Sequence, residues 1–413
     1  MSASQFRPEH RFDIVVVGAG PAGLCFARSL AGSGLRIALV ERQPRAALAD
    51  PAEDGREIAL THRSQRLMQA LGLWTRLADD DVSELRDALV LDGDDEDGLR
   101  FRRGSGEAGP LGWLVPNHAI RRAACAELLA TTDAVLFDGL RVTGVRTDAD
   151  GAEVRLDDGA TLTADLIVAA DSRFSETRRA MGIPATMRDF GKTMLVCRVR
   201  HEREHAHTAW EWFDYGQTLA LLPLRDPHLS SVVLTLPHAQ TMAVQALDAE
   251  AFGADMARRF HGRLGAMSFV GPCCAYPLVG VYPRHFVAER FATIGDAAVG
   301  MHPVTAHGFN FGLRGQDTLA TAIRDAHAAG RPFWSDALLQ GYERAHRRAT
   351  RPLYLATQLV AGLYTDEAPP AKLLRRAALR AAQRFAPFRK MVMAGLTDDG
   401  RGPLSSLSSR RAG

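Results

Sequence analysis

The chain has 413 residues, more than one compact hydrophobic core normally holds, so we expect two domains. A hydrophobic content of 46% and a net charge of +2 are typical of a globular protein and argue against nucleic-acid binding. Five cysteines without metal-ligand spacing favour a reducing compartment and predict no metal site. Because the sequence contains neither a signal-peptide pattern nor a run of 18 apolar residues, we expect a cytoplasmic protein.

The segment Phe12–Glu41 has the pattern of a βαβ unit. An apolar strand at 14–17 leads into Gly18-Ala19-Gly20-Pro21-Ala22-Gly23, then a helix to about residue 33 and a second strand at 36–40. This is the dinucleotide fingerprint: the first glycine permits a tight turn, the second lets the backbone approach a pyrophosphate, and the third lets the helix pack closely. Glu41 is placed to accept hydrogen bonds from a ribose, and Arg42 follows it. An acid there disfavours NADP, whereas NAD and FAD both remain.

The next hundred residues contain shorter signals. Arg56 precedes a short buried segment at 58–60. Two roles fit this arginine: contact with an anion or with flavin, or a place in a solvated loop. Ser64 is the expected N-cap of a helix that Gly72 ends. The acidic stretch at 79–97 predicts a solvated turn. A strand ends at Asn117, and the sequence predicts an amphipathic helix over 118–130.

Further along, the apolar run 165–171 predicts a second parallel strand, which ends in Asp171. From 186 to 280 the pattern changes to strand-like runs separated by polar turns, which predicts a separate antiparallel sheet inserted into the first domain. Trp210 and Trp212 lie on one of these strands, where aromatic pairs more often pack than react. A helix is expected at 248–264.

The chain then returns to the first domain. A short strand at 291–294 ends at Gly295-Asp296, and a loop with His302 and Pro303 leads to a helix start that contains Gly308 and Gly312. A carboxylate at the end of a parallel strand is placed for a ligand, because open α/β sheets bind at the carboxyl ends of their strands. Two glycines at a helix start let a flat ring approach the backbone.

Taken with these motifs, the chain resembles the UbiH/UbiF/UbiM/VisC family of FAD-dependent hydroxylases of ubiquinone biosynthesis, class A flavoprotein monooxygenases. The resemblance covers about residues 12–350. It is carried by Gly18–Gly23 with Glu41, by Arg56, by Asn117 in its VxxN segment, by the strand 219–223, and by Gly295-Asp296 with His302-Pro303 and Gly308-Phe-Asn310-Phe-Gly312. The form HPVTAHGFNFGL is most similar to the UbiM branch. The family's DGxxS motif reads Asp171-Ser172-Arg-Phe-Ser175 here.

The resemblance implies an α/β fold: a Rossmann-like FAD-binding domain (1–75, 100–185 and 281–350), a substrate domain built on an antiparallel sheet (76–99 and 186–280), and a basic helical tail (351–413). It implies hydroxylation of the aromatic ring of a polyprenylated phenol or quinol with NAD(P)H and O2. Asp296 would hold the ribityl chain, and Gly308, Asn310 and Gly312 the flavin ring. His302 and His307 are the candidate proton carriers, and ring packing is an equal alternative for them.

Three other functions remain open: a flavin-dependent reductase or dehydrogenase of the same fold, a hydroxylase of another small aromatic, and a non-catalytic nucleotide-binding protein. The tail also leaves two alternatives. Residues 371–413 hold ten Lys and Arg against two Asp and Glu. Its arginine stripe beside an apolar face fits either peripheral attachment to a membrane surface or packing on the FAD domain. Partners are therefore the hydrophobic substrate, O2, and either a membrane surface or other ubiquinone-biosynthesis proteins.

Overall fold

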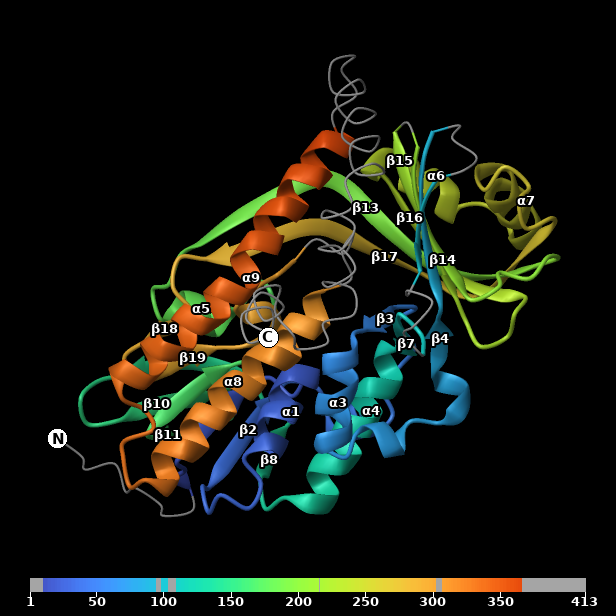
Figure 1. Cartoon of the computed structure of the whole chain (residues 1–413). Helices are drawn as coiled ribbons and strands as arrows, with labels where there is room; N and C mark the ends of the chain where they lie inside the picture. Colours follow the sequence, from blue (N-terminus) through green and yellow to red (C-terminus); the bar gives the residue numbers. More distant parts are fainter. Residues whose placement is uncertain (1–9, 94–97, 103–108, 215, 302–306, 366–413) are drawn as a thin grey trace, which may run out of the picture.

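The computed structural model describes residues 10–93, 98–102, 109–214, 216–301 and 307–365. Two large sheets organise this part of the chain. A six-stranded sheet has the order β18-β19-β12-β1-β2-β8, and a seven-stranded sheet has the order β17-β13-β16-β15-β14-β5-β6. Figure 1 shows the first sheet at the lower left and the second at the upper right. The predicted α/β class is confirmed.

The six-stranded sheet contains the predicted βαβ unit. Its strands are β1 (Ile14–Val17), β2 (Ile37–Glu41), β8 (Val135–Asp138), β12 (Leu166–Ala169), β18 (Val287–Ala288) and β19 (Phe291–Thr293). β1 pairs in parallel with β2 and β12, β12 with β19, and β2 with β8. Every residue of β1 and β12 is buried, which explains their unbroken apolar runs: both faces of a parallel sheet are covered.

Helices cover one face of this sheet and a small sheet covers the other. The helices are α1 (Pro21–Ser29), α4 (Asn117–Thr131) and α8 (Gly308–Ala328), and the small sheet contains β9 (Val142–Thr147), β10 (Ala152–Leu156) and β11 (Thr161–Ala164). Ile14 and Val16 of β1 belong to the core shared with the helices. Val15 and Val17 belong to the core shared with the small sheet. One short strand therefore supplies both cores.

The seven-stranded sheet contains two unusually long strands. Its members are β5 (Asp87–Asp92), β6 (Leu99–Arg102), β13 (Ala185–His201), β14 (Thr208–Asp214), β15 (Gln217–Pro223), β16 (Leu229–Pro237) and β17 (Met267–Pro283). β13 and β17 have 17 residues each and pair with each other from end to end. They run from this sheet to the six-stranded sheet's side of the molecule (Figure 1). β6 continues past residue 99, where the first segment of the substrate domain was predicted to end.

Several other elements of the described chain before residue 300 are short. They are α2 (Arg45–Ala49), β3 (Glu57–Leu60), α3 (His62–Ala70), the 3₁₀ turns η2 (Trp74–Arg76), η3 (Asp79–Asp81) and η4 (Gly295–Ala297), β4 (Ser83–Leu85), β7 (Gly112–Pro116) and α5 (Glu176–Ala180). The N-cap of α3 is Thr61, whose hydroxyl accepts a hydrogen bond from the backbone N–H of Ser64. The prediction of Ser64 as the cap was therefore wrong, because the helix begins with polar residues that precede its first apolar side chain.

Three more helices complete the described chain. α6 (His238–Gln245) and α7 (Ala249–Arg259) pack against one face of the seven-stranded sheet, and α9 (Asp336–Thr365) packs along α8. Among the residues that the structure describes, no helix is long and apolar enough to cross a membrane. The basic segment 371–413 lies outside the described residues.

Candidate active site

Three loops meet at one edge of the six-stranded sheet. β1, β12 and β19 are adjacent and parallel, so their carboxyl ends lead to Gly18, Asp171 and Gly295 on the same side. The packing is close: a Cβ added to Gly18 would lie 2.6 Å from the carbonyl oxygen of Ala170, and one added to Gly295 would lie 2.7 Å from the Cβ of Ala22. The strand order therefore brings together segments that are far apart in the sequence.

The three glycines of the fingerprint have different surroundings. Gly18 has a φ of +104°, which favours glycine, and a Cβ on Gly23 would lie only 2.0 Å from the carbonyl oxygen of Gly18. Gly20, the N-cap of α1, has open space where a Cβ would be, and no side chain caps the helix there. The first and third glycines are thus required by the fold itself, whereas the second leaves the N-terminus of α1 accessible to a ligand.

Glu41 ends β2 beside this turn. Its carboxylate accepts hydrogen bonds from the backbone N–H of Ala19 at 2.8 Å and of Gln43 at 3.0 Å. The side chain therefore joins the Gly-rich turn to the end of the neighbouring strand. Arg42 follows it and is exposed.

Asp296 lies in η4, directly after β19. Its carboxylate pairs with the guanidinium of Arg173 at 3.1 Å, yet 40% of the Asp296 side chain stays exposed. Arg173 belongs to the Asp171–Ser175 segment and also donates to the carbonyl oxygen of Val279 in β17. Sequence reasoning missed Arg173. The only signal for it was its position inside the motif that departs from the family pattern.

The N-terminus of α8 lies next to η4. A Cβ added to Gly312, in the first turns of α8, would lie 3.3 Å from the Cα of Gly295, so the helix and the turn are in close contact. Gly308 has open space where its Cβ would be. The N-cap is His307, which is half-buried with its ring 5.8 Å from that of Phe311. His302 and Pro303 lie outside the described residues.

Two amides predicted to bind the cofactor contact the protein. Asn310 is buried, accepts from the backbone N–H of Thr61 at 3.1 Å and donates to the carbonyl oxygen of Ala59 at 2.8 Å, so it joins α8 to the end of β3. Asn117 is also buried and donates to the carboxylate of Asp54 at 2.7 Å. Both side chains hold neighbouring segments in place.

Arg56 is held by a cluster between the two halves of the molecule. Its guanidinium contacts the Asp54 carboxylate at 2.6 Å and lies over the ring of Tyr276, 5.4 Å from its centroid. The Tyr276 hydroxyl donates to the carbonyl oxygen of Asp54 at 2.7 Å. Burial alone would raise the pKa of Asp54, but Arg56 and Asn117 lower it below its usual value. The carboxylate therefore stays charged and orients Arg56.

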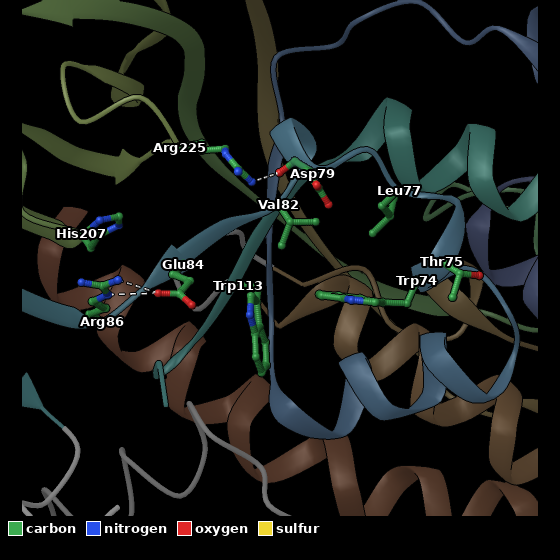
Figure 2. Close-up of a pocket in the computed structure, with 10 residues that line it drawn as sticks. All are labelled: Trp74, Thr75, Leu77, Asp79, Val82, Glu84, Arg86, Trp113, His207 and Arg225. Atoms are coloured by element: carbon green, nitrogen blue, oxygen red, sulfur yellow. Dashed lines mark hydrogen bonds and ion pairs between the residues drawn. The ribbon is translucent and has the colours of Figure 1, made fainter. Parts of the chain in front are cut away.

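A separate cavity of about 680 Å³ opens between the two halves (Figure 2). The indole rings of Trp74 and Trp113 lie on one side, 5.8 Å apart between centroids. His207 and Arg225 line it from the side of the seven-stranded sheet. None of the residues predicted to bind the cofactor is among those that line this cavity.

The comparisons with known proteins agree with this geometry. The model of the FAD binding domain family matches residues 11–353. The chain is 46% identical over 389 residues to the ubiquinone hydroxylase UbiM of Neisseria meningitidis, covering 93% of this chain and 84% of that protein. It is 35% identical to the ubiquinone hydroxylase UbiL of Rhodospirillum rubrum, covering 92% and 88%.

The chain belongs to the FAD-binding hydroxylase family. The likeness to UbiM confirms the predicted branch. The solved structure of p-nitrophenol 4-monooxygenase PnpA from Pseudomonas putida has a TM-score of 0.74 at 16% identity, covering 94% of this chain and 99% of that one. At that identity, PnpA supports the fold alone.

The cofactor of the family fits the residues of this site. FAD has a pyrophosphate and a flat ring, and the N-termini of α1 and α8 have no side-chain cap and leave open space at Gly20 and Gly308. The partly exposed Asp296 carboxylate lies on η4, which adjoins both helices. FAD is the cofactor of this protein, and the alternative of NAD at the fingerprint is set aside.

Proposed function

We propose that this protein is an FAD-dependent monooxygenase that hydroxylates the aromatic ring of a polyprenylated phenol or quinol in ubiquinone biosynthesis, using NAD(P)H and O2. The observation that carries the proposal is the 46% identity to UbiM across 93% of the chain. The geometry is consistent with it, because the cofactor elements and the seven-stranded sheet face each other through β3, β13 and β17. No described feature favours a reductase or a purely binding role.

We assign the cofactor contacts residue by residue. The backbone from Gly18 to Gly23 and the N-terminus of α1 receive the pyrophosphate, and Glu41 accepts from the ribose. Asp296 accepts from the ribityl chain. Arg56 offers a positive charge from the side of the seven-stranded sheet, with Asn117 acting on it through Asp54. Gly308 and Gly312 let the ring approach α8, and Asn310 holds that helix against β3.

The remaining residues orient the substrate and exclude water. Reduced FAD, when bound, supplies an activated oxygen atom derived from O2. The apolar inner face of the seven-stranded sheet gives an aromatic ring a dry surface, which protects that oxygen from reaction with water. His307 stays a candidate proton carrier at the α8 N-terminus, and His302 stays a prediction outside the described residues.

The apolar tail of the proposed substrate determines where the enzyme meets it. A polyprenylated phenol partitions into membranes, so the enzyme meets it at a bilayer surface or receives it from another protein of the pathway. The basic segment 371–413 supports the first route, because each Lys or Arg near an anionic surface contributes about 1 kcal/mol to attachment.

The decisive experiment combines a spectrum with product analysis. Purified protein should show flavin absorbance and should consume NAD(P)H in the presence of a prenylated phenol only when O2 is supplied. The product should be one oxygen atom heavier by mass spectrometry. A strain lacking the gene should accumulate the unhydroxylated ring. If NAD(P)H is consumed without O2 and no hydroxylated product forms, the enzyme is a reductase and the proposal fails.

A further inference from the structure

The two faces of the seven-stranded sheet have different roles. Trp212 is buried on the face that α7 covers, within the same core as Phe252 and Phe260, and its indole N–H donates to the carbonyl oxygen of Gly93 at 2.9 Å. Trp210 packs against that core as well. Because side chains alternate along a strand, Glu211 between them points to the opposite face. The expectation that the two tryptophans pack is therefore correct, and Glu211 has different surroundings from both.

The strand register places Glu211 in one row of side chains across the whole sheet. The row runs from β6 to β17 through directly paired residues: Leu99, Val90, Glu211, Ala220, Val233, Val196 and Cys274. Paired residues lie on the same face of a sheet. Apart from Glu211 and the thiol of Cys274, every side chain in this row is apolar.

This face is the one turned toward the cofactor elements. The side chain of Val196 comes within 3.5 Å of where a Cβ of Gly55 would be, one residue before Arg56. Arg198, two residues along β13 on the same face, pairs with Glu57 of β3 at 3.0 Å. β15, which holds the residue opposite Glu211, contacts β4. The row therefore lies on the side of the sheet that faces the FAD-binding half of the molecule.

Glu211 differs from the other ionisable groups on this side of the sheet. Arg198 is paired with Glu53 and Glu57, Arg56 with Asp54, and Cys274 and Tyr276 lie beside that pair. The side chain of Glu211 has neither a hydrogen bond nor an ion pair with any residue that the structure describes. Burial raises its pKa to about 8, with no charged neighbour acting on it. The Glu211 side chain is half-buried, so its carboxyl group, which has no partner among the described residues, is open to a ligand that supplies one.

We propose that Glu211 is a catalytic residue that binds the ring hydroxyl of the substrate and accepts its proton. This inference rests on the proposed function. The O–H bond breaks, the proton moves to a carboxylate oxygen of Glu211, and the electron pair left on the substrate oxygen enriches the ring carbon that attacks the transferred oxygen. The ring proton displaced at that carbon then leaves to water. A base whose pKa lies close to the working pH suits a phenol.

The test compares Glu211→Gln with wild type and with Glu204→Gln, a control in the same domain whose side chain is 67% exposed. The probe is 2-geranylphenol, and its methyl ether serves as a probe without the acidic proton. We expect kcat/KM for the phenol to fall about 10²- to 10⁴-fold in Glu211→Gln, as loss of a general base does. In wild type kcat/KM should decline as the pH falls below about 8, and this limb should be absent in the variant.

Readouts apart from turnover separate the outcomes. Glu211→Gln should keep the unfolding temperature and FAD affinity of wild type, and its preference for the phenol over the methyl ether should be weaker than that of wild type, because a neutral amide oxygen accepts a weaker hydrogen bond than a carboxylate. Wild-type rates and an unchanged pH profile in Glu211→Gln would overturn the inference while leaving the proposed function intact. If wild type itself forms no hydroxylated 2-geranylphenol although it holds FAD, the proposed function fails and the inference fails with it.

Discussion

At the scale of single residues, similar side chains have different roles because their surroundings differ. Asp296 and Asp54 are both carboxylates near the cofactor elements. Asp296 keeps 40% of its side chain exposed, whereas the Asp54 side chain is 18% exposed and contacts both Arg56 and Asn117. Only the first is open to a ligand. A substitution at each position therefore tests a different property, cofactor affinity for Asp296 and domain contact for Asp54.

Replacing Asp296 with Ala should weaken FAD binding, because a hydrogen bond to a charged acceptor is lost. Such a bond contributes about 1.5–3 kcal/mol, which corresponds to roughly 10- to 150-fold in the dissociation constant. The measurement is titration of the cofactor-free protein with FAD. Asp325→Ala, at an exposed position near the end of α8, is the control. Equal affinities for Asp296→Ala and wild type would remove Asp296 from the proposed site.

His346 is a buried residue that acts as an aromatic packing group. Its ring stacks on Tyr342 at 5.6 Å and lies 5.5 Å from Phe286, and neither ring nitrogen has a hydrogen-bond partner among the described residues. Burial lowers its pKa to about 3. The unfolded chain therefore binds this proton first as the pH falls. The resulting stability is complete above about pH 6.5 and is lost progressively toward pH 3.

His346→Phe should remove this source of acid sensitivity. Between pH 7.5 and 5.5 the wild-type free energy of unfolding should drop by about 1.4 kcal/mol more than that of the variant. Urea unfolding at both pH values measures the difference. Taking the difference between variant and wild type cancels the contributions of other histidines, such as His201 and His205, whose pKa values burial also lowers. His327→Phe, at an exposed site, should change nothing; an unaltered acid response in His346→Phe would contradict the assignment.

At the scale of elements, we expect the N-termini of two helices to bind the cofactor. α1 begins at a glycine and α8 at a half-buried histidine, both without a side-chain cap, whereas α3, α5 and α7 are capped by Thr61, Ser175 and Asp248. A side-chain cap occupies the free N–H groups of the first turn. Because α1 and α8 both begin at the cofactor loops, the N–H groups of their first turns stay accessible to phosphate and to the ring.

Gly20→Ser should separate binding from folding. The site has room for a side chain, φ is −70°, and serine is a favoured N-cap, so the cofactor-free protein should be at least as stable as wild type. FAD affinity should fall by tenfold or more, because the hydroxyl group occupies both the space and the N–H groups of the pyrophosphate.

Gly23→Ala provides the matched comparison. Its Cβ would lie 2.0 Å from the carbonyl oxygen of Gly18, so this variant should lose stability even without FAD. Thermal unfolding of the cofactor-free proteins and FAD titration give both quantities. Wild-type FAD affinity in Gly20→Ser would show that α1 does not hold the pyrophosphate.

At the scale of the whole molecule, charge is distributed unevenly. The chain carries +2 in total, while residues 371–413 alone carry ten basic and two acidic residues. The FAD binding domain match ends at residue 353, before this segment. The basic segment is thus separable from the matched region in sequence, which makes truncation a direct test of its role.

Truncation after Pro370 should leave FAD binding and the unfolding temperature unchanged. Full-length protein should sediment with anionic phospholipid vesicles at low salt and be released by salt, because screening weakens attraction between exposed charges. The truncated protein should stay in the supernatant, and neutral vesicles are the control for both. If the full-length protein ignores anionic vesicles, or if truncation abolishes FAD binding, the segment packs on the protein instead.

The sequence by itself determined the features that depend on neighbouring residues. The βαβ unit from β1 to β2, the Gly18–Gly23 turn, the strand before Asp296 and the helix beginning at Gly308 are all encoded by local apolar periodicity and glycine placement. The same short motifs carried the family resemblance, and hence FAD and the expected reaction. No long-range contact is needed to recognise any of them.

Tertiary structure decided which partner each polar side chain meets. The sequence does not reveal that Asn310 holds β3, that Asn117 acts through Asp54, that Arg173 pairs with Asp296, or that β13 and β17 extend over 17 residues each. In the sequence, Glu211 is only a residue between two tryptophans that pack. The pairing of the seven strands shows that it lies on the face of the sheet toward the cofactor elements. The physical reason is that hydrogen bonds and burial depend on segments brought together by the fold, whereas periodicity records only which face of an element is apolar.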